Sequence, residues 1–115
     1  MNRFDKTRRL LKKSDYDHVF SQAQKMVTAE FIVLYRENTI GHARLGLALS
    51  KKMIAKAHDR NRVKRMLRVT FRTSELLPAI DIIVLARQGV SKVQNSIIIA
   101  RLSKAWNKLS ASCGK

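Results

Sequence analysis

Apolar side chains recur over residues 14–23 with the spacing i, i+3, i+4 and i+7, which predicts an amphipathic helix. The apolar positions are Tyr16, Val19, Phe20 and Ala23. Ser14 precedes them as the expected N-cap, and Asp17 lies three residues later, as in a capping box. The pattern therefore predicts one short helix with a single apolar face.

Two later runs have the composition and alternation of strands. Residues 31–35 (Phe-Ile-Val-Leu-Tyr) are aromatic or β-branched for the most part, and residues 44–50 alternate strictly. In the second run Leu45, Leu47 and Leu49 share one face, while the other face has small residues. Residues 38–42 between the runs have turn-forming composition, so we expect the two strands to pair antiparallel.

The second half of the chain predicts a helix, a strand and a helix. The helix covers about residues 59–73 and ends before Pro78, because proline cannot continue it. Residues 81–86 are almost continuously apolar, which is typical of a central strand covered on both faces. After Gly89 and Ser91, apolar positions mark one side of a last helix: Ile98, Leu102, Ala105, Trp106 and Leu109. This order predicts an α+β fold, an α/β sandwich with three helices and one mainly antiparallel sheet.

The net charge of the chain indicates what kind of partner it binds. The chain has 24 Lys and Arg against 8 Asp and Glu, a formal net charge of +16, so a polyanion is the expected partner. Nucleic acid is favoured over a membrane surface, because the apolar faces are needed for a core. We expect one domain over residues 1–115, with residues 1–13 as a flexible basic arm that lacks the apolar stretch of a signal peptide. The expected location is cytoplasmic.

The helix predicted at 59–73 has a core face and a cationic face. Val63, Met66, Leu67, Thr70 and Phe71 fall on one arc at 100° per residue. On the opposite arc lie Asn61, Arg65, Arg68 and Arg72, with Arg62 and Lys64 on its flanks. No acidic residue occurs between Arg60 and Arg72, so the like charges repel unless an external anion offsets them. This favours phosphate binding over a merely solvated helix face.

The same segment resembles the signature of the bacterial ribonuclease P protein family. Ser50-Lys51-Lys52 matches its strand end, and residues 57–65, Ala-His-Asp-Arg-Asn-Arg-Val-Lys-Arg, match its arginine-rich helix, followed by Arg68 and Phe71-Arg72. Weaker matches extend over residues 10–20, 31–35, 44–46 and 81–87. The resemblance covers nearly the whole chain and adds to the reading from charge.

The resemblance implies a fold like the second domain of ribosomal protein S5, with a left-handed βαβ crossover between the strand ending at Lys52 and the strand starting at Asp81. Residue patterns alone favour a right-handed one. It also implies an endoribonuclease holoenzyme whose RNA binds the activating Mg²⁺, with the catalytic RNA subunit and precursor tRNA as partners and no obligatory protein partner. Expected ligands of the RNA subunit are Lys51, Lys52, Arg60, Asn61, Arg62, Lys64, Arg65, Arg68 and Arg72. Expected ligands of the single-stranded 5′ leader, in a cleft, are Tyr16, Phe20 and Tyr35.

Catalytic chemistry is not expected from the protein itself. Its acidic residues show none of the groupings that hold two metal ions, and His18, His42 and His58 lie on different predicted elements. The single cysteine, Cys113, excludes an intramolecular disulfide and a thiolate zinc site. We therefore expect no catalytic residue and no metal site in the protein alone. A structural RNA-binding protein of the ribosomal type stays open as an alternative.

Overall fold

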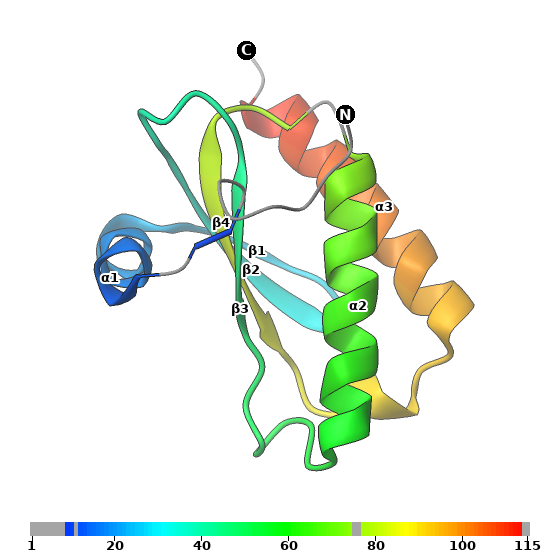
Figure 1. Ribbon diagram of the computed structural model, residues 1–115. Coiled ribbons are helices and arrows are strands. Elements are labelled where there is room, and N and C mark those ends of the chain that lie inside the picture. The colour runs from blue at the N-terminus through cyan, green and yellow to red at the C-terminus, as the bar shows by residue number, and fades with distance from the viewer. Residues whose placement is uncertain (1–8, 11, 75–76, 114–115) are drawn as a thin grey trace.

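The computed structural model describes residues 9–10, 12–74 and 77–113. Three helices, four strands and a short 3₁₀ turn follow one another along the chain (Figure 1). In order they are α1 (Lys13–Gln22), β1 (Gln24–Val27), β2 (Phe31–Glu37), β3 (Arg44–Ala48), α2 (Ala57–Thr73), β4 (Ile80–Ala86), η2 (Val90–Lys92) and α3 (Asn95–Cys113).

The four strands form one sheet in the order β1-β2-β4-β3. β1 pairs antiparallel with β2, β2 antiparallel with β4, and β3 parallel with β4. The α+β class with a mainly antiparallel sheet is confirmed, and so is the central place of residues 81–86. The predicted pairing of residues 31–35 with 44–50 is wrong, because β4, apolar on both faces, lies between β2 and β3. The left-handed crossover stays a prediction.

Helices cover both faces of the sheet, with α1 on one side and α2 and α3 on the other (Figure 1). The larger core lies between the sheet and the helix pair, where Trp106 of α3 is almost completely buried. Its Nε1 donates to Oγ1 of Thr70 at 2.9 Å, and its ring meets Phe71 edge-on at 6.0 Å. These contacts bind α3 to the buried face of α2.

A smaller cluster lies under α1, where Leu10, Val19 and Ile83 are buried. Leu10 also donates its backbone N–H to the carbonyl of Leu45, so this part of the predicted arm lies along β3. Residues 1–8 and residue 11 of the arm fall outside the described residues. None of the described helices is both long enough and apolar enough to cross a membrane.

Several elements differ from expectation, and β3 ends at Ala48, two residues before the predicted end of its run. α1 begins at Lys13 with Lys12 as N-cap and no side-chain cap, so the capping roles of Ser14 and Asp17 are wrong; the carbonyl of Lys12 accepts the first helical hydrogen bonds instead. α2 begins at Ala57, two residues before the predicted start. β1 was not expected, because only four residues form it and three of them are exposed.

Candidate nucleic-acid interface

α2 has one buried face, as its periodicity predicts. Val63, Met66, Leu67, Thr70 and Phe71 are all buried. Thr70 lies in the middle of this face and satisfies its hydroxyl by donating to the carbonyl of Met66 at 2.8 Å. Burying side chains of this size stabilises a fold by about 1.5–3 kcal/mol each, so the orientation of the helix is fixed by its apolar side.

The opposite face of α2 is open and cationic. Asn61, Arg65, Arg68 and Arg72 are exposed and line an open groove of about 600 Å³ together with Arg9 and Val69. Among the described residues, no ion pair or hydrogen bond is found for the side chains of Arg65, Arg68 and Arg72. Their guanidinium groups therefore present all their donors to whatever enters the groove.

Arg62 does not line this groove, and its guanidinium is held by groups within the protein. Its guanidinium donates to the carbonyl of Ser91 at 2.8 Å, to that of Val93 at 3.4 Å and to Oδ1 of Asn95. Nε also lies 3.9 Å from Oδ1 of Asp59. Arg62 thus ties α2 to the segment that leads into α3.

Arg60 also has a structural role that the sequence did not indicate. Its Nη1 donates to the carbonyls of Ile54 at 2.9 Å and Ala55 at 3.0 Å, so it holds the connection from β3 against the first turn of α2. Lys51 and Lys52 lie exposed in that connection. Of the two arginines that flank Asn61, neither belongs to the open face.

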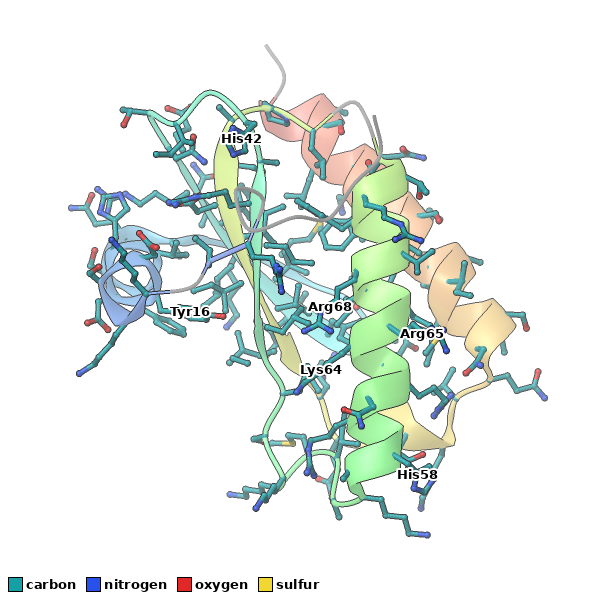
Figure 2. All side chains as sticks on the ribbon, viewed as in Figure 1. Tyr16, His42, His58, Lys64, Arg65 and Arg68 are labelled. Atoms are coloured by element: carbon teal, nitrogen blue, oxygen red, sulfur yellow. The ribbon has the colours of Figure 1, made fainter. Side chains whose placement is uncertain are left out.

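A second hollow continues the groove toward α1. It measures about 170 Å³ and lies between the side of α2 that carries Lys64 and Arg68 and the part of α1 that carries Tyr16 (Figure 2). Its lining residues are Arg9, Leu10, Tyr16, Leu45, Leu47, Lys64 and Arg68. Arg9 and Arg68 line both hollows, so cationic side chains connect the aromatic ring to the open face of α2.

The absence of a side chain at Gly46 leaves the space that the Tyr16 ring occupies. A Cβ built on Gly46 would lie 2.8 Å from the tyrosine hydroxyl and 2.9 Å from Cζ, closer than any side chain tolerates. Only a residue without a side chain leaves room for the ring above β3. The small residues on this strand face were noted in the sequence, but the residue that covers them could not be inferred.

Two arginines from the sheet hold α1 at both ends. Arg44 donates two hydrogen bonds of 2.8 Å to the buried carboxylate of Asp81 and lies 3.6 Å from Asp15 in the first turn of α1. The hydrogen bond to Asp81 raises the pKa of the Arg44 guanidinium above its ordinary value. Arg36 donates to the carbonyl of His18 at 2.7 Å. These contacts fix the helix that carries Tyr16.

The three aromatic residues predicted to form a cleft do not line one common hollow in the described structure. Tyr35 packs against the larger core, on the sheet face opposite to Tyr16, because it shares a face with Phe31 and Val33 in β2. Leu34, the preceding residue of this strand, packs instead against the smaller cluster under α1, to which Tyr16 also belongs. Phe20 lies on α1 one turn beyond Tyr16 and is 48% exposed, outside the residues that line the hollow.

The histidines lie apart on the described structure. His18 is on α1. Figure 2 shows His42 in the turn before β3 and His58 at the start of α2. Nε2 of His58 lies 3.3 Å from Oδ1 of Asp59. Within residues 9–10, 12–74 and 77–113, no group of three or more His, Cys, Asp or Glu is placed to hold a metal ion. The exposed arginines that line the groove on α2 suit that surface to binding an anion.

Comparisons with known proteins agree with this character. Residues 4–110 match the model of the family described as Ribonuclease P. The chain is 60% identical over 112 residues to the ribonuclease P protein component of Legionella pneumophila, covering 97% of both chains. It is similar to the solved RNase P proteins of Staphylococcus aureus (30% identity, TM-score 0.81, covering 90% of this chain and 94% of that one) and Thermotoga maritima (27%, 0.77, 87% and 96%).

Proposed function

Because the chain belongs to the ribonuclease P protein family and acts in the ribonuclease P holoenzyme, which processes the 5′ end of tRNA, we propose that its two connected hollows divide the RNA between them. The open face of α2 binds the RNA subunit, and the hollow beside Tyr16 binds the 5′ leader of precursor tRNA. The observation that carries the proposal is the continuity of the two hollows through Arg9 and Arg68.

The RNA subunit is bound mainly through phosphates. Arginine forks fit phosphate oxygens in pairs, and the exposed arginines of α2 have their donors available. The proposed ligands are Lys51, Lys52, Lys64, Arg65, Arg68 and Arg72, with Asn61 as an additional hydrogen-bonding group. Arg60 and Arg62 support this surface by holding the two ends of the segment in place.

The leader is bound as a single strand. Tyr16 offers a ring on which an unpaired base can stack, and such a contact contributes about 1–3 kcal/mol without regard to base identity. Lys64 and Arg68 lie in the same hollow and supply the charge for the leader's phosphates. A sequence-tolerant contact suits a protein that meets many precursors.

The chemistry belongs to the RNA in this proposal. Mg²⁺ is expected on the RNA subunit, since the described residues provide no carboxylate cluster to hold it. The protein contributes affinity and orientation, and its place of action is the cytoplasm.

Leader dependence of binding tests the proposal. The affinity of the holoenzyme for precursor tRNA with a five-nucleotide leader is compared with that for mature tRNA. Tyr16→Ala should weaken binding of the leader-bearing RNA by about tenfold, equivalent to about 1.4 kcal/mol, and leave mature tRNA unchanged. Tyr35→Phe is the matched control, because Tyr35 packs on the other sheet face.

Two outcomes contradict it. Equal loss for both RNAs would place Tyr16 outside the leader site. Release of leader by the pure protein in millimolar Mg²⁺, without the RNA subunit, would show that the protein is itself the nuclease. Reconstitution at low Mg²⁺ with and without the protein completes the test, since leader removal should then depend on the protein.

A further inference from the structure

Another hollow, with cationic side chains on its rim, lies at the edge of the sheet formed by β1, away from the α2 groove and from the hollow beside Tyr16. It measures about 240 Å³ and lies between the β1–β2 turn and α3. Its lining residues are Met26, Val27, Thr28, Ala29, Arg101, Lys104, Ala105 and Lys108. β1 and β3 are three strand spacings apart, about 15 Å, so this hollow is separate from the one beside Tyr16.

The rim of this hollow has an excess of positive charge. Lys104 and Lys108 are exposed on α3, and in the part of the chain that the structure describes neither forms an ion pair. Arg101 does, with the buried carboxylate of Glu30. A ligand that satisfies this rim must carry more than one negative charge.

The Glu30–Arg101 pair gives the hollow a fixed planar cation. The Glu30 side chain is 2% exposed, whereas that of Arg101 is 50% exposed, so the carboxylate holds the guanidinium from the protein side and its remaining surface faces outward. A guanidinium plane held in this way is a platform on which an unpaired base stacks.

Hydrogen bonds within the protein hold the β1–β2 turn, which forms the wall opposite α3. Thr28 accepts from the N–H of Phe31 at 3.0 Å, and its carbonyl accepts from Nη1 of Arg87 at 2.8 Å. The N–H of Arg87 donates to the carbonyl of Glu30 at 2.9 Å. Binding to a turn fixed by these contacts requires little ordering, which favours affinity.

From this arrangement we infer that the β1–β2 turn and α3 form a second binding site for single-stranded RNA, distinct from the two hollows assigned to the RNA subunit and the leader. One base lies on the Arg101 plane against the aliphatic side chains of Val27 and Ala29. The flanking phosphates are bound by Lys104 and Lys108. Neutral apolar ligands and duplex RNA do not satisfy both parts of this site.

The test removes the α2 surface and the Tyr16 ring and asks what binding is left. The full-length chain with Tyr16→Ala, Arg65→Ala, Arg68→Ala and Arg72→Ala is titrated with a fluorescein-labelled adenylate decamer and with an abasic decamer of equal phosphate number. We expect the adenylate decamer to bind about tenfold more tightly, which matches one stacked base. Arg101→Lys keeps the charge and removes the plane, so it should bring this ratio close to one.

Glu30→Gln separates positioning from simple electrostatics. Removing a carboxylate raises the positive charge, so a purely electrostatic site would bind both decamers more tightly. A positioned guanidinium predicts the reverse for the adenylate decamer, because Arg101 loses its anchor. Lys104→Ala with Lys108→Ala should weaken both decamers and flatten the dependence of log K on log[salt] by about 1.4. Lys92→Ala, an exposed lysine outside the hollow, is the control and should leave the ratio unchanged.

The inference fails if the variant that lacks the α2 surface and the Tyr16 ring binds neither decamer or binds both equally. It also fails if adding Glu30→Gln to that variant strengthens the binding of both decamers. It also fails if a glutamate decamer binds more tightly than the adenylate decamer, since the hollow would then be a site for acidic peptides. Thermal unfolding of each variant shows whether it is folded. If Glu30→Gln does not fold, Arg101→Lys alone decides whether the Arg101 plane stacks on a base.

Discussion

Replacing Gly46 with alanine should push Tyr16 out of its place. The new Cβ would lie 2.8 Å from the Tyr16 hydroxyl, 2.9 Å from its Cζ and 3.0 Å from Cδ1 of Leu10. Overpacking of this kind costs about 1–3 kcal/mol. Against it stands a gain of about 0.5–1 kcal/mol, because glycine within a strand is less favourable than alanine. The expected net loss in the free energy of unfolding is about 1–2 kcal/mol.

A double-mutant cycle isolates this contact. In a Tyr16→Ala background the two shortest contacts are absent, so Gly46→Ala should be neutral or stabilising by up to about 0.5 kcal/mol, with a coupling energy of about 2 kcal/mol. Tyr16→Phe should give an intermediate value, because it removes the hydroxyl and keeps Cζ.

Urea denaturation measures the cycle, and leader-dependent binding by the holoenzyme measures its functional side. Gly46→Ala should lower the affinity for leader-bearing precursor tRNA and leave that for mature tRNA unchanged. If Gly46→Ala costs the same with and without Tyr16, the ring does not depend on this glycine, and the reasoning is refuted.

Three further perturbations test the supporting contacts. Asp81→Ala removes two hydrogen bonds from Arg44 and leaves its largely buried charge with Asp15, at 3.6 Å, as its one acidic partner within the described part of the chain. Urea denaturation should therefore show a loss of about 3 kcal/mol, and a loss below about 1 kcal/mol contradicts this. Arg62→Ala should lower stability by about 1.5–3 kcal/mol while the salt dependence of RNA binding stays constant; a flatter dependence would return Arg62 to the binding face. Trp106→Phe should cost about 1–2 kcal/mol in thermal or urea unfolding, and no change would mean that its hydrogen bond to α2 is unimportant.

The faces of α2 were predictable because burial follows the helical period. The residues on the apolar arc, which include Val63 and Phe71, are buried, and Arg65, Arg68 and Arg72 on the opposite arc are exposed, as the spacing alone indicates. The role of Arg62 was not predictable in the same way. Its partners lie about 30 residues further along the chain, in a segment whose position depends on how α3 packs.

For the sheet too, some features were predictable from the sequence and others depend on how the elements pack. The continuous apolar run in β4 was enough to predict a central strand. Neighbouring runs in the sequence suggested that β2 and β3 pair, but the parallel β3–β4 arrangement depends on α2 returning the chain across the sheet. Tyr35 was expected beside Tyr16 because the family resemblance aligns both residues with one cleft. Alternation along the strand gives two faces and does not say which one meets α1. In the structure Tyr35 packs against the larger core, and Leu34 packs in the cluster under α1.

The central claim is that the exposed cationic residues on and before α2 bind RNA phosphates, and the salt dependence of binding to the cognate RNA subunit tests it most directly. Six cationic groups are proposed to make phosphate contacts, which predicts a slope of log K against log[salt] of about −4 to −5. Replacing Arg65 and Arg68 with alanine should flatten that slope by about one unit each. A slope that stays the same in the double variant would contradict the claim.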